Sequence, residues 1–384
     1  PGGAARDDLT RRRARGELVD WAPRAGRLLR EAGVAPGGTV ALLLGNRVEL
    51  VEMATAAVLA GARFTAVNWH LTADEVRYVV DDAGARVLVT EPAYAGVAAE
   101  AVAGLGVDVV EAGPHLDGLL AGASDEPFPL DGPAGRSMLY TSGTTGRPKG
   151  VVRTGPATVA DQLAALSAVG RGVGLDGGGP HLVTGPLYHA APLGFALGDL
   201  HAGAEIVLMP RFDAAATLRL IDERAVRASH LVPTMFVRLL RLDEAVRASF
   251  DGASLHTVLH GAAPVSPRVK AQMIEWWGPV LVEYWGTSEA GVFTLVGSQD
   301  WLDRPGTVGR AVPHYEVFAV GDDGTVLPPG EVGRLYCRHR RQQQVFEYHG
   351  APDQTAAAHL EPGVFTMGDI GRVDADGFVH LADR

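Results

Sequence analysis

Short apolar segments alternate with segments of helical periodicity through the first three quarters of the chain, and this alternation restricts the fold to few classes. Residues 39–44 and 85–90 are almost wholly apolar, whereas residues 18–33 and 72–82 place apolar side chains at helical spacing. Strands that are apolar on both sides belong to sheets covered on both faces. The sequence therefore predicts an α/β fold with parallel-type sheets flanked by helices. The same patterns predict further helices over 49–60, 157–169, 214–223, 233–242 and 267–276, and strands over 136–140, 181–185, 205–209 and 257–260.

The pattern changes at about Val308, where short alternating strands are broken by glycine and proline. Turn signals occur at 321–324 and at 374–377, and the second of these, Asp-Ala-Asp-Gly, is typical of a hairpin connection. We therefore expect residues 1–307 to form sheet-and-helix subdomains and residues 308–384 to form a small antiparallel, β-barrel-like subdomain.

Composition and charge argue against several classes of function. The 384 residues carry a net charge of −11 with a pI near 5.6, which argues against a nucleic-acid-binding surface. The basic cluster at 11–15 is expected to be a solvated helix face. No apolar run approaches the roughly 18 residues of a membrane span, and the single cysteine, Cys337, suits a reducing cytoplasm. The sequence therefore predicts a cytoplasmic protein whose partners are small molecules, and it leaves the oligomeric state open.

One loop concentrates groups that bind phosphate. Residues 140–150 read Tyr-Thr-Ser-Gly-Thr-Thr-Gly-Arg-Pro-Lys-Gly and continue a predicted strand. A strand that runs into a loop with free N–H groups, hydroxyls and a cation is a site for polyphosphate. The loop differs from the common G-x-x-x-x-G-K-[ST] motif because Pro148 stands at the second glycine and Gly150 follows Lys149. A solvated Ser/Thr/Gly linker is the alternative interpretation.

A second glycine-rich stretch matches a nucleotide motif without its context. Residues 172–177 satisfy G-x-G-x-x-G, the dinucleotide-binding fingerprint. That motif needs a strand before it and a helix directly after it, and these residues follow a predicted helix. We therefore expect a loop here and no dinucleotide site.

The segment Glu283-Tyr-Trp-Gly-Thr-Ser-Glu289 is a further candidate, because its last carboxylate is a hard oxygen ligand of the kind that Mg²⁺ prefers. Locally, an acid beside glycine and serine is also typical of a capped turn. Together with residues 140–150, this segment resembles the signature motifs of the AMP-forming acyl-CoA synthetases, relatives of luciferases, coumarate ligases and peptide-synthetase adenylation domains. The resemblance spans nearly the whole chain. The sequences of the matched motifs are most similar to those of bacterial fatty-acyl and bile-acid-type CoA ligases.

The resemblance implies that ATP, Mg²⁺ and coenzyme A take part, with roles that follow the matched motifs. Trp285 falls where an aromatic ring lies against adenine, and Glu289 falls where a carboxylate holds Mg²⁺. Ser288 falls where a hydroxyl, more often of threonine, meets the α-phosphate. Asp369 matches the ribose-binding acid, although Met367 replaces the usual Thr or Ser, and a turn aspartate is the alternative. In full, the resemblance implies catalytic roles for Lys149, Glu289, Ser288 and His189; nucleotide contacts for Thr141, Ser142, Gly143, Thr144, Thr145, Gly146, Lys149, Gly261, Ala262, Ala263, Pro264, Glu283, Tyr284, Trp285, Gly286, Thr287, Ser288, Asp369 and Arg384; substrate contacts for His189, Phe195, Val232, His260 and Gly286; and metal contacts for Glu289 and Thr144.

Two segments are implied to surround the base and the acid. Residues 260–264, His-Gly-Ala-Ala-Pro, resemble the segment whose backbone flanks adenine, and small residues allow that approach. His189 is implied to border the passage where the acyl carboxylate meets the α-phosphate, with a purely structural histidine as the alternative. The small residues within 190–198 either leave room for a bulky acyl group or allow close helix packing. We expect a fatty, polycyclic or terpenoid-like acid.

The expected reaction is ATP-dependent adenylation of a hydrophobic carboxylic acid to acyl-AMP and pyrophosphate, followed by thioester formation with coenzyme A. A carrier-protein thiol is the alternative acceptor. By resemblance, a C-terminal domain with a second lysine follows the hinge motif that starts at 383–384, so we expect that domain to be absent here and thioester formation to be impaired. A serine hydrolase that uses Ser288 lacks the closing glycine of G-x-S-x-G. A nucleotide-binding module that has lost catalysis is the non-enzymatic alternative.

Overall fold

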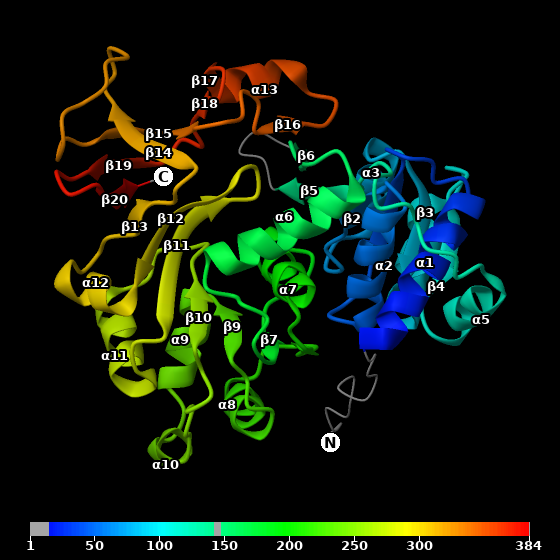
Figure 1. Cartoon of the computed structure of the whole chain (residues 1–384), viewed down its shortest axis with the longest axis horizontal. Helices are drawn as coiled ribbons and strands as arrows, with labels where there is room; N and C mark the ends of the chain where they lie inside the picture. Colours follow the sequence, from blue (N-terminus) through cyan, green and yellow to red (C-terminus); the bar gives the residue numbers. More distant parts are fainter. Residues whose placement is uncertain (1–14, 142–146, 384) are drawn as a thin grey trace. The chain divides into compact units, whose positions relative to one another are not determined.

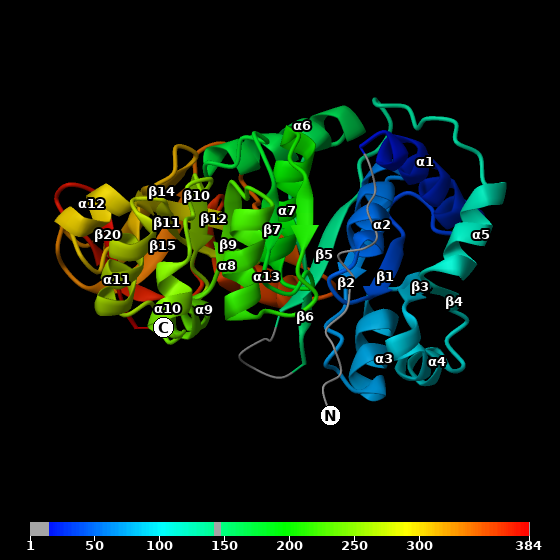
Figure 2. The same cartoon turned by 90° about the horizontal axis from the view of Figure 1, so that it is seen from below.

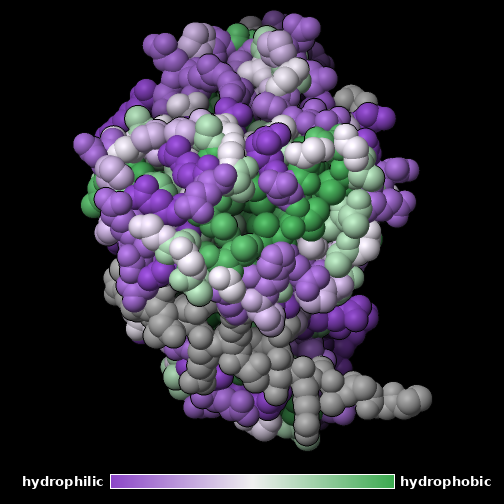
Figure 3. Space-filling view, turned by 90° about the vertical axis from the view of Figure 1, so that its right-hand side faces the viewer, coloured by the Kyte–Doolittle hydropathy of each residue, from purple (hydrophilic) through white to green (hydrophobic). Residues whose placement is uncertain are grey.

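The computed structural model describes residues 15–141 and 147–383 (Figure 1). The chain forms two compact units: unit 1 comprises Pro1–Arg171 and Val183–Arg211, and unit 2 comprises Gly172–Leu182 and Phe212–Arg384. No helix in the described ranges is long and apolar enough to cross a bilayer. The face shown in Figure 3 is largely hydrophilic, with an apolar area near its middle.

Unit 1 contains a mixed sheet and one further short strand. The strands of the sheet are β1 (Thr39–Leu43), β2 (Arg63–Ala66), β3 (Ala85–Thr90), β4 (Asp108–Glu111), β5 (Arg136–Thr141) and β6 (Lys149–Arg153), and the further strand is β8 (Ile206–Leu208). The spatial order is β6-β5-β2-β1-β3-β4. All neighbours in this order are parallel except β5 and β6, which form an antiparallel pair. The predicted parallel-type sheet is therefore confirmed.

Helices cover both faces of this sheet, which explains why β1 is buried along its whole length. Val40 and Leu42 pack in one core with helices from one side, whereas Ala41 and Leu43 pack in a second core with helices from the other. Figure 2 shows α1, α2 and α5 on one side of the strands and α3 and α4 on the other. The helices of unit 1 are α1 (Arg15–Glu31), α2 (Val48–Leu59), α3 (Ala73–Asp82), the 3₁₀ turn η1 (Pro92–Tyr94), α4 (Ala95–Val102), α5 (Pro114–Gly122), α6 (Val159–Gly172), which ends at the unit boundary, and α7 (Ala190–Ala202).

The start of α3 is fixed by a capping box. The Thr72 hydroxyl accepts a hydrogen bond from the Glu75 amide at 3.4 Å, and the Glu75 carboxylate accepts one from the Thr72 amide at 2.8 Å. These two bonds satisfy N–H groups that a helix start otherwise leaves without partners. The sequence Thr-x-x-Glu therefore sets where α3 begins, and with it which residues the helix presents to the neighbouring loop.

Unit 2 combines a parallel core with an antiparallel extension. Its strands are β9 (Ala228–Leu231), β10 (Thr257–His260), β11 (Leu281–Thr287), β12 (Gly291–Gly297), β13 (Gly309–Ala311), β14 (Tyr315–Val320), β15 (Gly333–His339), β16 (Phe346–Tyr348), β17 (His359–Glu361), β18 (Val364–Phe365), β19 (Ile370–Val373) and β20 (Phe378–Asp383); β7 (His181–Val183) crosses the unit boundary. β9, β10 and β11 are parallel neighbours. From β11 the antiparallel order continues β12-β13-β20-β19-β15-β18-β17, with β14 added to β15.

The antiparallel pairing predicted beyond Val308 is present, but the described strands form no closed barrel. β14 pairs with β15 alone, so the ladder ends there and does not return to β13. The 374–377 turn joins β19 to β20 as a hairpin, with Val373 opposite Val379, as its sequence predicts. Residues 172–177 lie in the connection from α6 to β7, so no helix follows them and the dinucleotide motif lacks its context.

Helices and aromatic rings complete unit 2. Phe293 of β12 lies at the centre of an aromatic cluster, 5.0 Å from Trp285, 5.3 Å from Tyr315 and 5.7 Å from Phe365, measured between ring centroids. These contacts tie the parallel strands to the antiparallel extension, which carries Asp369. The helices are α8 (Ala214–Glu223), α9 (Pro233–Leu240), α10 (Glu244–Ala248), α11 (Pro267–Trp277), α12 (Ser298–Asp303) and α13 (Pro352–Ala358).

Candidate active site

In unit 2, three predicted site segments meet at one edge of the sheet. His260 lies opposite Leu231 on one side and Glu283 on the other, so β9 and β10 end level with each other, while β11 continues past them to Thr287. Val232 therefore leaves the sheet beside residues 261–264 and beside the second half of β11. Ligands of parallel α/β sheets bind outside the carboxyl ends of the strands. This register therefore brings together residues 261–264, which are predicted to flank adenine, Trp285, and the predicted acyl contact Val232.

The predicted adenine and ribose residues are hydrogen-bonded to each other. The indole Nε1 of Trp285 donates to Oδ2 of Asp369 at 3.1 Å, and the two residues are only 8% and 6% exposed. Asp369 follows β18, and its own carbonyl accepts from the Leu335 amide at 2.8 Å. The Thr366 hydroxyl accepts from the Gly368 amide at 3.1 Å, which shapes this turn. Asp369 is therefore a fixed, buried carboxylate at the edge of the sheet.

Two glycines of the predicted site are required by packing within unit 2. A Cβ on Gly261 would lie 2.5 Å from the carbonyl oxygen of Tyr284, and one on Gly286 would lie 2.2 Å from that of Gly291. Ala262 adopts a left-handed φ of 63°, a conformation that costs a non-glycine residue about 1–2 kcal/mol. Such strain is concentrated at functional sites. Ala262, Ala263 and Pro264 are exposed, so the backbone of this segment is accessible.

Glu289, the predicted metal ligand, lies in the turn that joins β11 to β12. Its Oε1 accepts a 3.4 Å hydrogen bond from the Tyr348 hydroxyl. Burial, reinforced by the Glu289 charge, raises the pKa of Tyr348, so this hydroxyl remains a donor at neutral pH. Across the described ranges, no three His, Cys, Asp or Glu side chains converge on a possible metal position. A single carboxylate fits Mg²⁺, which takes one or two protein carboxylates and completes its shell with phosphates and water.

The same turn positions Ser288 and excludes the hydrolase alternative. The Thr287 hydroxyl accepts from the Ala290 amide at 3.3 Å, and Ser288 lies between these two residues in a strand-turn-strand hairpin. A nucleophilic serine of the G-x-S-x-G type requires a strand-turn-helix elbow. The hairpin geometry therefore leaves Ser288 as a hydroxyl beside Glu289.

Two buried polar pairs support this edge from within unit 2. Lys270 of α11 places Nζ 2.5 Å from Oε2 of Glu283, and its side chain is fully buried. Tyr284 and His230 are joined by a 3.0 Å hydrogen bond between the phenol oxygen and Nε2. Burial lowers the pKa of Lys270 to about 8 and raises that of Glu283. His260 is also fully buried, and burial lowers its pKa well below 6.5.

In unit 1, the predicted phosphate loop connects two paired strands. Thr141 at the end of β5 lies opposite Lys149 at the start of β6, so the glycine-rich segment closes an antiparallel hairpin. Ser142, Gly143, Thr144, Thr145 and Gly146 lie outside the described residues, as does Arg384. Lys149 is therefore placed where the loop ends, as a phosphate-binding lysine requires.

Helix α3 holds both ends of this loop. The Tyr140 hydroxyl donates to Asp82 Oδ2 at 2.5 Å, and the Tyr78 hydroxyl donates to the Pro148 carbonyl at 2.9 Å. The Arg147 guanidinium also lies 5.0 Å from the Tyr78 ring centroid. Sequence reasoning missed these residues. Their signal was the i, i+4 spacing of Tyr78 and Asp82 on a predicted helix, which places them on one face.

Asn46 fixes the segment that carries His189. Its Nδ2 donates to the carbonyls of Gly185 and Met209, both at 2.9 Å, and its Oδ1 accepts from the Leu187 amide at 2.8 Å. All four groups are buried, so each bond satisfies a polar group that water does not reach. The sequence did not single out Asn46. An asparagine directly after a buried strand, at the usual ligand edge, was the available signal.

The His189 ring is presented at the start of α7. His189 is the N-cap of that helix, and its ring centroid lies 4.5 Å from that of Tyr188. The side chain remains exposed, while partial burial of the ring lowers its pKa, so the imidazole is neutral at pH 7. Phe195 is buried in α7. A Cβ on Gly198 would lie 3.1 Å from the Leu166 carbonyl, so at this position close helix packing explains the small residue.

The comparisons with known proteins agree with the motifs. The family model described as AMP-binding enzyme matches residues 5–347. The feruloyl-CoA synthase of an Amycolatopsis species is 33% identical over 367 residues, which cover 93% of this chain and 70% of that enzyme. The fatty acid–[acyl-carrier-protein] ligase ScoC of Streptomyces coeruleorubidus is 31% identical over 369 residues, covering 93% of this chain and 69% of the ligase. The inhibitor-bound N-terminal domain of FACL13 from Mycobacterium tuberculosis superposes with a TM-score of 0.83 at 26% identity, covering 96% of this chain and 91% of that one.

The chain belongs to the AMP-binding enzyme family. The fold is the one that the resemblance implied, and acyl-thiol ligases are among its similar proteins.

Proposed function

We propose that this protein activates a carboxylic acid with ATP, forming an acyl-adenylate and pyrophosphate, and passes the acyl group to a thiol. The observation that carries the proposal is the buried Trp285–Asp369 hydrogen bond at the carboxyl edge of the parallel strands. The bond joins an aromatic ring suited to a base and an acid suited to a ribose diol. Family membership supplies the reaction class.

In the proposed reaction, a carboxylate oxygen of the acid attacks the α-phosphorus of ATP. A new O–P bond forms, the bond between the α-phosphorus and its bridging oxygen breaks, and pyrophosphate leaves with that oxygen. Lys149 and the hydroxyls of the 141–146 loop stabilise the departing negative charge. When bound at Glu289, Mg²⁺ supplies charge neutralisation on the phosphates. No protein nucleophile is required, because positioning and electrostatics supply the catalysis.

The remaining residues orient the two reactants. Neutral His189 donates a hydrogen bond to the acyl carboxylate without trapping it as an ion pair. Ser288 donates to the α-phosphate, and Asp369 accepts from the ribose hydroxyls.

For the acid, we propose a hydrophobic substrate. The proposed acyl contacts Phe195 and Val232 are apolar, and His260 carries no charge because burial lowers its pKa. The names of two relatives support an acid with an apolar body and differ in its type, since one is a feruloyl-CoA synthase and the other a fatty-acid ligase. They also differ in the acceptor, coenzyme A or a carrier protein, and we propose coenzyme A with the carrier thiol as the second candidate.

Acid-dependent exchange between ATP and labelled pyrophosphate tests the proposal, because it reports the adenylation step alone. A panel of fatty, aryl and polycyclic acids should give exchange with one class. Asp369→Ala and Lys149→Ala should reduce it at least a hundredfold. Asp376→Ala, which removes an exposed carboxylate from the 374–377 turn, is the matched control and should retain activity. ATP binding without exchange for any acid would instead support the non-catalytic nucleotide-binding module.

A further inference from the structure

Unit 1 contains a cavity that is separate from the residues assigned to adenylation. It has a volume of about 580 Å³, within the range of small-molecule sites. The cavity lies between α1, the end of α2 and the segment that leads into β5. Its principal lining residues are Arg27, Arg30, Leu59, Phe128, Pro129 and Pro133.

The aromatic wall of the cavity is built into the fold. A Cβ on Gly26 would lie 2.7 Å from the Phe128 ring, so the ring packs directly against the backbone of α1 at this glycine. A glycine inside a helix costs about 1 kcal/mol relative to alanine. Likewise, a Cβ on Gly61 would lie 2.6 Å from the carbonyl of Pro133. Phe128 and Pro133 are therefore held against α1 and α2 by specific packing.

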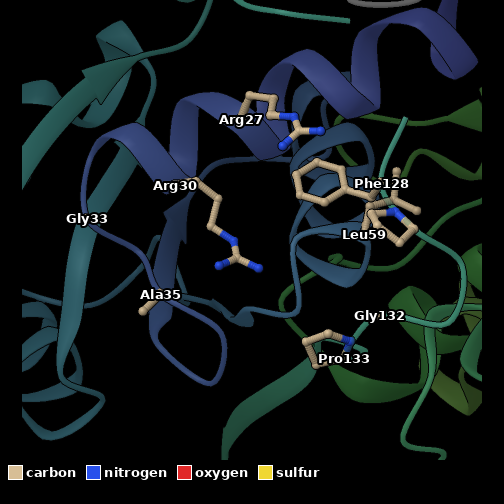
Figure 4. A pocket seen from close by; sticks show the side chains of 9 residues that line it. Arg27, Arg30, Gly33, Ala35, Leu59, Phe128, Gly132 and Pro133 are labelled. Atoms are coloured by element: carbon tan, nitrogen blue, oxygen red, sulfur yellow. The ribbon is translucent and has the colours of Figure 1, made fainter. Parts of the chain in front are cut away.

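The two arginines differ in how their charges are compensated. The Arg27 guanidinium lies 4.5 Å from the Phe128 ring centroid and pairs with Glu126 at 3.6 Å. Arg30 has neither a hydrogen-bond acceptor nor a carboxylate partner among residues 15–141 and 147–383, and its Nε is buried without a bond. Figure 4 shows its guanidinium reaching into the middle of the cavity, between Phe128 and Pro133.

The electrostatics of Arg30 agree with this geometry. Burial and the neighbouring Arg27 charge lower the pKa of Arg30, and no carboxylate offsets them. Two adjacent cations with one counter-charge attract an anion, and a guanidinium recognises carboxylate and phosphate groups through paired N–H donors. The apolar walls formed by Leu59, Pro129 and Pro133 suit a hydrocarbon body attached to that anionic group.

We propose that this cavity binds an amphipathic organic anion, whose carboxylate or phosphate group pairs with Arg30 and whose apolar body lies against Phe128. The site is distinct from the proposed adenylation site and does not depend on it. An inorganic ion lacks the apolar part, and a neutral alcohol lacks the charge, so both should bind more weakly than a molecule with both features.

Calorimetric titration of the 384-residue chain with hexyl phosphate and with hexanoate tests the proposal. At least one should bind in the micromolar to low millimolar range, and the tighter of the two identifies the head group. Arg30→Gln should weaken that binding at least tenfold, whereas Arg171→Gln, which removes an exposed arginine at the end of α6, should leave it unchanged. Comparing the two variants separates this cavity from an acid-binding active site.

Three further results would overturn the proposal. The first is an Arg30→Gln affinity equal to that of the unsubstituted chain. The second is hexanol binding as tightly as the anions, which would mean that charge plays no part. The third is inorganic phosphate binding as tightly as hexyl phosphate, which would mean that the apolar wall plays no part. Arg30→Lys, which keeps the charge and changes the shape, should retain an intermediate affinity.

Discussion

The buried ion pair behind the candidate site gives the most quantitative test of the physical account. Lys270 is completely buried in α11, and its Nζ lies 2.5 Å from Glu283 Oε2 and 4.6 Å from the Trp301 ring centroid. Glu283 is 5% exposed and opens the 283–289 segment. Lys270→Met keeps the length and apolar body of the side chain and removes the charge alone.

The expected loss of stability in Lys270→Met follows from the buried carboxylate that this change leaves behind. Without Lys270, the Glu283 carboxylate stays buried with no cation beside it, and removing one partner of a buried pair costs about 3–5 kcal/mol. Replacing both partners by apolar residues of similar volume is often neutral or stabilising. The double variant Lys270→Met/Glu283→Leu should therefore lie within about 1 kcal/mol of the unsubstituted chain.

Urea unfolding followed by tryptophan fluorescence measures these differences. Arg268→Met, which removes an exposed positive charge from the same helix, is the matched control and should change stability by no more than about 0.5 kcal/mol. The reasoning is refuted if Lys270→Met costs less than about 1 kcal/mol, or if the double variant is as unstable as the sum of the two single ones.

Three further predictions concern the loop, the adenine segment and acid stability. Tyr140→Phe removes the hydrogen bond from the loop to Asp82 and should weaken ATP binding roughly tenfold by calorimetry; unchanged affinity would show that this anchor is dispensable. Ala262→Gly relieves the left-handed strain and should stabilise the fold by about 0.5–1 kcal/mol in denaturant, whereas Ala263→Gly, where φ is negative, should not. Burial lowers the pKa of His201 to about 4, below its unfolded value near 6.5, so the unfolded chain binds more protons between these values. His201 should therefore contribute its full stabilisation above pH 6.5 and lose up to about 3 kcal/mol of it as the pH approaches 4, and the total fall measured in His201→Phe should be smaller by that amount.

The elements of the fold could be predicted because their signal is local. The apolar run at 39–43 is buried on both faces, and the apolar stripe of α3 packs at helical spacing, so pattern and burial agree. The 374–377 turn likewise carries its hairpin geometry in its own four residues. The antiparallel extension does not close into a barrel, because closure depends on how many strands pair and in what order, and no single segment encodes that.

The site was predictable as motifs but not as contacts. The loop and the 283–289 segment carry recognisable residues, yet Asp369 lies 84 positions from the Trp285 indole that holds it. Asn46 lies 139 positions from the Gly185 carbonyl that it binds. Gly286 was predicted from its motif alone, and the structure adds a reason for its small size, because the neighbouring strand leaves no room for a Cβ. Partners brought together by tertiary folding leave no periodic signal in one sequence.

The central claim, that this chain binds an acyl-adenylate, is tested most directly with a stable acyl-sulfamoyl-adenosine in a thermal unfolding assay. At a hundred times its dissociation constant, the ligand should add about 2.7 kcal/mol of stability. The account predicts this stabilisation for one acyl class, its loss in Asp369→Ala and its retention in Asp376→Ala. No stabilisation by any acyl-sulfamoyl-adenosine, or equal stabilisation of Asp369→Ala, would contradict it.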